Sequence, residues 1–65
     1  MNWTRIDDDH YVTADERFTC YYVPARREWV LFEKTRYGTH RKIDYFNTRE
    51  ATFAHVESRT QRTVR

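Results

Sequence analysis

The chain has 65 residues, of which 38% are hydrophobic, 17% aromatic and 34% charged, and its formal net charge is +2. These values predict one small folded domain and exclude a typical disordered chain. No apolar stretch approaches the roughly 20 residues of a membrane helix, and no signal peptide is visible. A single cysteine, Cys20, excludes an intramolecular disulfide and favours a reducing compartment. We therefore expect a soluble cytoplasmic protein with no membrane partner.

The charge is unevenly distributed along the chain. Residues 1–16 contain one arginine and five acids, whereas residues 17–65 contain eleven basic residues and five acids. An acidic N-terminal segment followed by a basic segment indicates either an intramolecular contact between the two or a basic surface for an anionic partner. A mixed, solvated surface is the ordinary alternative.

The first 16 residues predict an acidic arm or two short strands. Residues 3–6 can form an edge strand or a packed arm, and residues 10–13 can form a short strand. Three consecutive aspartates, 7–9, separate them and favour a turn over a strand.

Residues 17–46 predict an antiparallel sheet of three strands. The central strand is 28–33, because residues 29–32 form the only run of four large apolar side chains in the chain. Such a run is typical of a strand that is buried on both faces. Strand 17–23 precedes it across a turn at Pro24, and strand 40–46 follows a turn that contains Gly38.

The alternation of side chains along strands predicts a register. We expect Tyr22 opposite Trp29 and Trp29 opposite Tyr45. The same register places Glu33 opposite Arg41 as a cross-strand ion pair. The predicted core face contains Phe18, Cys20, Tyr22, Trp29, Leu31, Ile43 and Tyr45. The opposite face, where we expect the function, contains Thr19, Tyr21, Val30, Phe32, His40, Lys42 and Asp44.

Residues 47–60 predict one helix that packs on this sheet, followed by a basic tail at 61–65. Its narrow apolar stripe at helical spacing consists of Thr52, Phe53, Val56 and Thr60. Asn47 is the predicted N-cap, with Glu50 completing a capping box, and Thr48 is the alternative cap. The predicted fold is α+β, with an antiparallel sheet of three to four strands against one C-terminal helix.

The sequence contains no recognisable catalytic, cofactor or metal motif. The acidic cluster 7–10 lacks the ligand spacing of a calcium loop. Cys20 and the three histidines share no recognised metal-ligand spacing. The single glycine excludes a glycine-rich phosphate loop. We expect no enzyme activity, no cofactor, no metal and no catalytic residue.

The strongest local feature is the basic segment 34–42, which has four fixed positive charges and no acid at a predicted hairpin tip. A basic two-stranded ribbon can enter a major groove and contact phosphates and guanine edges. The predicted contact residues here are Lys34, Arg36, Tyr37, Arg41 and Lys42. A charged hairpin that only keeps a sheet edge soluble is the alternative.

The strands that lead through Phe46-Asn47-Thr48-Arg49-Glu50-Ala51 into a helix resemble the AP2-like arm-binding domains of tyrosine integrases. The resemblance covers residues 17–58 and implies a three-stranded sheet on one helix. It also implies DNA contacts on the exposed sheet face, near Thr19, Tyr21, Arg41 and Lys42. The chain lacks the glycine that usually precedes that phenylalanine, and its acidic N-terminal segment has no counterpart. More loosely, the chain is similar to small orphan proteins of bacteriophages and their actinobacterial hosts with an aromatic ββββα pattern, which implies an accessory role.

The sequence thus predicts a non-enzymatic nucleic-acid-binding module with duplex DNA as the expected partner. The alternative is a phage or mobile-element interaction module that binds a host protein or forms a homodimer. Exposed Val30 and Phe32 would favour this alternative, because apolar patches mark protein interfaces. Salt separates the two, since binding to nucleic acid weakens steeply with ionic strength.

Overall fold

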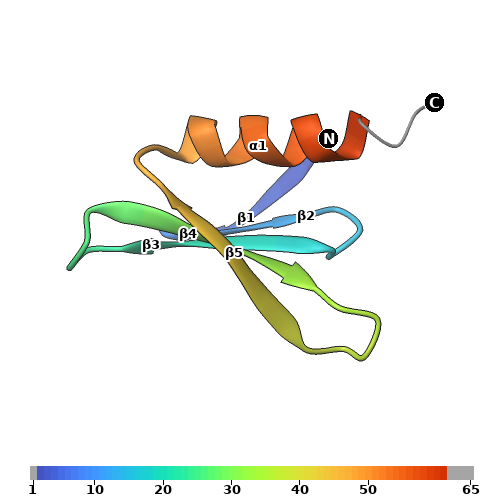
Figure 1. Ribbon diagram of the computed structural model, residues 1–65. Coiled ribbons are helices and arrows are strands. Elements are labelled where there is room, and N and C mark those ends of the chain that lie inside the picture. Colours follow the sequence, from blue (N-terminus) through green and yellow to red (C-terminus); the bar gives the residue numbers. More distant parts are fainter. Residues whose placement is uncertain (1, 62–65) are drawn as a thin grey trace.

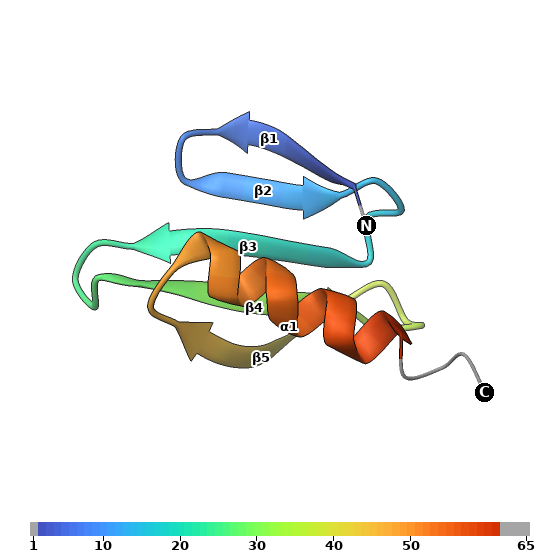
Figure 2. The ribbon, with the colours of Figure 1, turned by 90° about the horizontal axis from the view of Figure 1, so that it is seen from above.

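A computed structural model describes residues 2–61, without the side chains of residues 60 and 61. Its elements, in chain order, are β1 (Trp3–Asp7), β2 (His10–Thr13), β3 (Phe18–Val23), β4 (Glu28–Lys34), β5 (His40–Phe46) and α1 (Arg49–Gln61). The strands form one antiparallel sheet in the order β1-β2-β3-β4-β5. The helix lies on one face of this sheet and leaves the other face uncovered (Figures 1 and 2).

This architecture confirms the predicted α+β class. The sheet has five strands, because residues 1–16 contribute the hairpin β1–β2 instead of a separate arm. The turn between β1 and β2 uses the aspartate run as predicted, since the Asp7 side chain accepts a hydrogen bond of 2.9 Å from the backbone N–H of Asp9. Residues 62–65 of the predicted basic tail lie outside the described residues.

The turn between β2 and β3 is held by side-chain hydrogen bonds. The Thr13 hydroxyl donates to Asp15 Oδ1 at 2.7 Å and accepts from the backbone N–H of Phe18 at 3.1 Å. The same Asp15 oxygen accepts from the backbone N–H of Arg17 at 3.0 Å. These bonds, first that from Arg17 and then that from Thr13, lower the pKa of Asp15. A buried threonine thus joins the first two strands to the rest of the sheet.

The core lies between the helix and the middle of the sheet. Its fully buried members are Phe18, Cys20, Leu31 and Val56. Partly buried side chains surround them, namely Trp3, Tyr11, Trp29, Ile43, Phe46 and Phe53. Leu31 is buried as predicted, whereas Trp29 and Ile43 are only half-buried at the edge of this layer. Trp3 on β1 stacks on Phe53 of α1 with ring centroids 4.3 Å apart, so the helix also contacts the first hairpin.

Thr48, the alternative cap, is the N-cap of α1. Its hydroxyl accepts a hydrogen bond of 3.0 Å from the backbone N–H of Ala51, the third residue of the helix. The prediction of Asn47 as the cap with Glu50 in a capping box is therefore wrong by one residue. Glu50 instead forms an ion pair of 3.1 Å with Arg49 on the exposed surface.

Most of the predicted register is present. Tyr22 lies opposite Trp29, and Glu33 lies opposite Arg41. Both pairs follow from the strict alternation of side chains around the two turns.

The register of β5 beyond its middle differs from the prediction. Trp29 lies opposite Phe46, not Tyr45, because a β-bulge makes Ile43 an extra residue between the partners of Leu31 and Phe32. One inserted residue exchanges the two faces of the strand that follows it. Phe46 therefore joins the core in the place predicted for Tyr45, and Asp44, predicted on the opposite face, pairs with Leu31.

Cys20 gives a prediction that tests the packing of this core. Its thiol is 0% exposed, and burial raises its pKa from 9.0 to about 11. A thiol reagent at neutral pH should therefore label native protein at least about a hundredfold more slowly than protein unfolded in denaturant. Because the folded state holds this proton more tightly, stability should fall as the pH rises from 9 towards 11. Equal labelling rates in the two states would show that the core is open.

Candidate nucleic-acid interface

The uncovered face of the sheet carries a continuous row of aromatic and basic side chains. Partners across neighbouring strands share this face, which places Tyr21 beside Val30 and Val30 beside Tyr45. In the next rows Thr19 lies beside Phe32, Phe32 lies beside Lys42, and Lys34 lies beside His40. Val30 is only 6% exposed between its two tyrosine neighbours, so it does not supply the exposed apolar patch that would favour a protein-interaction module. Phe32 is half-buried.

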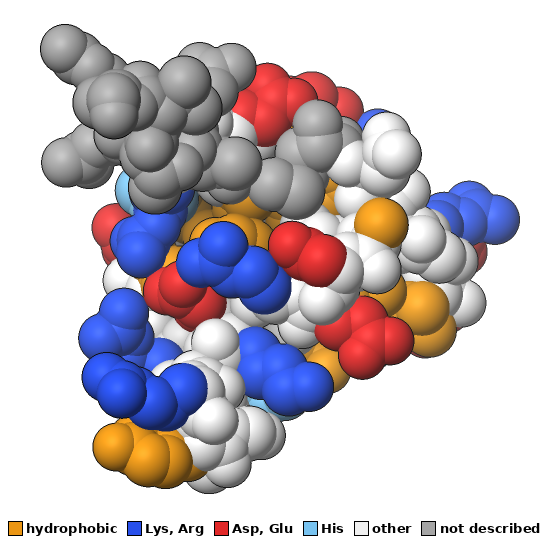
Figure 3. All heavy atoms as spheres, turned by 90° about the vertical axis from the view of Figure 1, so that its right-hand side faces the viewer, with side chains coloured by type: hydrophobic (Ala, Val, Ile, Leu, Met, Phe, Trp, Pro, Cys, Tyr) orange, Lys and Arg blue, Asp and Glu red, His pale blue; other side chains and the backbone are white. Residues whose placement is uncertain are grey.

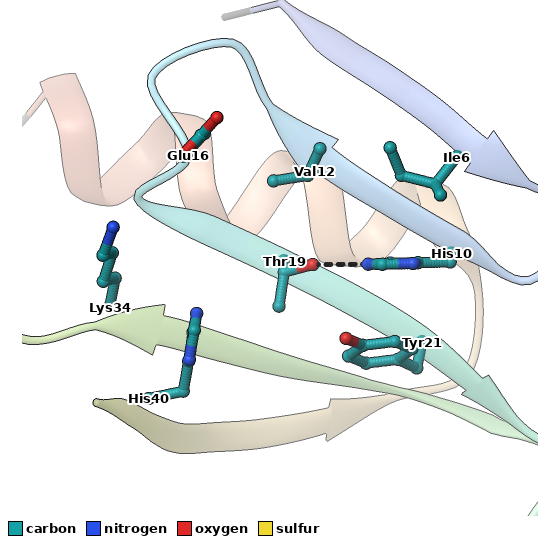
Figure 4. A pocket seen from close by; sticks show the side chains of 8 residues that line it. All are labelled: Ile6, His10, Val12, Glu16, Thr19, Tyr21, Lys34 and His40. Atoms are coloured by element: carbon teal, nitrogen blue, oxygen red, sulfur yellow. Dashed lines mark hydrogen bonds between the residues drawn. The ribbon is translucent and has the colours of Figure 1, made fainter. Parts of the chain in front are cut away.

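An open hollow of about 320 Å³ lies on this face (Figure 4). Its lining residues come from all five strands and one turn: Ile6, His10, Val12, Glu16, Thr19, Tyr21, Lys34 and His40. A smaller depression of about 210 Å³ shares three of these residues and adds Phe32. The predicted site residues Thr19, Tyr21 and Lys34 thus all line one hollow, in which Thr19 is only 7% exposed.

One side of the hollow is an ordered aromatic pair. The rings of His10 and Tyr21 stack with centroids 4.2 Å apart and an interplanar angle of 21°. The Thr19 hydroxyl donates its one hydrogen to the carbonyl of Tyr11 at 3.1 Å, so at 3.0 Å it accepts from Nε2 of His10. This bond fixes the orientation of the imidazole and, in the neutral ring, leaves Nδ1 as a hydrogen-bond acceptor.

Tyr45 extends the aromatic surface along the same face. The guanidinium carbon of Arg26 lies 3.8 Å from the centre of its ring, and the ammonium of Lys42 lies 4.9 Å from it. The predicted site residue Lys42 is therefore on the uncovered face and is held near an aromatic ring. Tyr45 and Arg26 were not predicted as site residues. The bulge at Ile43, which places Tyr45 on the uncovered face, has no signal in the sequence.

The tip of the β4–β5 hairpin projects away from the helix (Figure 1). The backbone N–H of Thr35 donates to the Thr39 carbonyl at 2.7 Å, and that of Gly38 donates to the Thr35 carbonyl at 3.0 Å. Gly38 has a φ of 86°, which only glycine adopts without strain. Tyr37 is 83% exposed at this tip, with the guanidinium carbon of Arg36 5.7 Å from the centre of its ring.

Arg41 is separated from the other predicted contact residues. It lies on the helix-covered side, where its guanidinium is 3.4 Å from Glu33. The same carboxylate accepts from Arg17 and from Arg59 of α1, each at 3.2 Å. Sequence reasoning found only the pair with Arg41. Figure 3 views this end of the molecule, where Lys and Arg side chains gather around a few carboxylates.

Neither a cluster of metal ligands nor a membrane-spanning helix is present in residues 2–61. In this part of the chain, no three histidine, cysteine or acidic side chains converge to hold a metal ion. Among the same residues, no helix is both long enough and apolar enough to cross a bilayer.

The sequence matches no known protein-family model, and neither a curated protein nor a solved structure shows significant similarity to it. The resemblance to the arm-binding domains of integrases therefore remains a prediction.

Proposed function

We propose that this protein is a small non-enzymatic nucleic-acid-binding module that uses the uncovered sheet face and the β4–β5 hairpin. One observation carries the proposal: basic and aromatic side chains lie together on a single surface that the helix does not cover. The basic members are Lys34, His40 and Lys42, and the aromatic members are Tyr21, Phe32 and Tyr45. Cations contact phosphates, and aromatic rings can stack on bases.

The charges of the hairpin support the same proposal. Lys34, Arg36 and Lys42 have no carboxylate partner within the described part of the chain, whereas Arg41 forms an ion pair with Glu33. Unpaired cations on a projecting ribbon are available to an anionic partner. Because a two-stranded ribbon fits a major groove, duplex DNA is the first form to test.

A salt titration with labelled duplex tests the proposal. Three phosphate contacts predict a slope of log affinity against log salt of about −2.7. Affinity should then fall roughly fortyfold between about 50 and 200 mM salt. The measurement is fluorescence anisotropy at three or more salt concentrations, with a single strand of the same sequence in parallel. Absence of binding to both forms at the lowest salt would rule out the proposed function.

A protein-interaction module is the second candidate. Ile6 is 55% exposed beside the hollow, and the outer edges of β1 and β5 have no partner strand among the described residues. An exposed apolar side chain near an open sheet edge can contact another protein or a second copy of this chain. Such a contact should persist in high salt and in nuclease-treated samples, which separates it from the first candidate.

A further inference from the structure

We propose that the hollow on the uncovered face binds one unpaired base of the bound nucleic acid. This inference rests on the proposed function and adds the form of nucleic acid that the surface prefers. The cavity, about 320 Å³, is at the lower end of the range for small-molecule sites, about 300–1,000 Å³. A site of this size suits a single ring system, and a base within a duplex is not available to it.

The aromatic pair is the stacking surface for this base. Tyr21 is 41% exposed, so its ring remains accessible although it already stacks on His10. Phe32 supports Tyr21 from the neighbouring strand, in an edge contact with centroids 6.1 Å apart. Because the hydrogen bond from His10 to Thr19 holds the pair in place, little side-chain entropy is lost when a base binds.

The polar groups of the hollow lie toward the end opposite this pair. Figure 4 shows Glu16, Lys34 and His40 at one end, with His10 and Tyr21 at the other. Lys34 can contact the phosphate of the unpaired nucleotide, and it also begins the basic hairpin proposed to follow the duplex. The Glu16 carboxylate can accept a hydrogen bond from an exocyclic amino group, as carboxylates do from cytosine. The hollow and the hairpin therefore form one continuous surface for a duplex that contains an unpaired base.

The test compares three labelled duplexes of the same sequence with wild-type protein. One is fully paired, one has a single bulged cytidine, and one has the same bulge without its base. The two bulged duplexes have the same charge and backbone, so they differ only in the group that enters the hollow. Stacking of one base predicts on the order of tenfold tighter binding to the bulge that has the base.

Two variants assign any preference to the hollow. Tyr21→Ala should remove the preference for the base, whereas Arg27→Ala, which truncates an exposed side chain in the turn between β3 and β4 outside the hollow, should keep it. Equal affinity of wild-type protein for the two bulges, with salt-dependent binding intact, would overturn this inference and leave the proposed function standing. A preference that survives in folded Tyr21→Ala would also overturn it. Failure to bind all three duplexes at low salt would rule out the proposed function itself.

Discussion

Leu31→Ala is expected to leave most of the protein unfolded at 37 °C. Leu31 is 0% exposed on β4, and it belongs to the buried cluster between the sheet and α1. Truncation of a buried leucine costs about 2–5 kcal/mol, which combines the lost burial with the cavity that remains. A domain of this size tolerates little loss of stability, because the free energy of unfolding of small proteins can be as low as about 5 kcal/mol.

Thermal and urea unfolding followed by circular dichroism measure this effect. Ile6→Ala is the matched control, because Ile6 is 55% exposed and its truncation should change stability by less than about 0.5 kcal/mol. An unchanged melting temperature for Leu31→Ala would mean that the core is not built around β4.

The double charge reversal Arg36→Glu with Lys42→Glu is expected to lower affinity for duplex at least about a hundredfold at low salt. Both cations lie on the β4–β5 hairpin and neither has an acidic partner within the described residues, so their loss breaks no ion pair of the fold. Each lost phosphate contact should also flatten the salt slope by about 0.9. The circular dichroism spectrum should remain that of the wild type.

A second double reversal, Arg5→Glu with Arg27→Glu, separates a local contact from a change in net charge. It changes the net charge by the same amount on β1 and in the turn between β3 and β4, away from the hairpin tip. This control should weaken binding only slightly. Equal losses in the two double variants would show that the hairpin has no special role in binding.

The sequence predicted strand positions well because the strongest signals are local. The apolar run at Trp29 places β4, and Gly38 places the turn that β5 requires. The prediction that this run is the central strand is wrong, because the hairpin β1–β2 extends the sheet and makes β3 its middle strand. The predicted register of β5 is wrong beyond one inserted residue, Ile43, because the position of this bulge depends on how the twisted strands meet. The N-cap is Thr48 and not the predicted Asn47. Both residue types are good caps, and only the backbone conformation decides between them.

The site was predictable in part for the same reason. Tyr21, Lys34 and Lys42 follow from alternation on strands with clear signals, and the structure places them on the uncovered face. The hollow was not predicted, because it needs β2 beside β3 and thus His10 beside Tyr21. No local pattern in the acidic N-terminal segment indicates that pairing.

The strand order, which repeats the order of the chain, has a consequence for folding kinetics. Each strand pairs with the strand that precedes or follows it, so every step of sheet assembly closes only a short loop. Such a low contact order favours rapid folding, in which hairpins join one after another along the chain. The helix adds the last layer, because its apolar side chains need Trp3 and Leu31 from separate hairpins before they can be covered. A chain leaving the ribosome can therefore form its sheet in the order of synthesis, with little exposure of long unpaired edges.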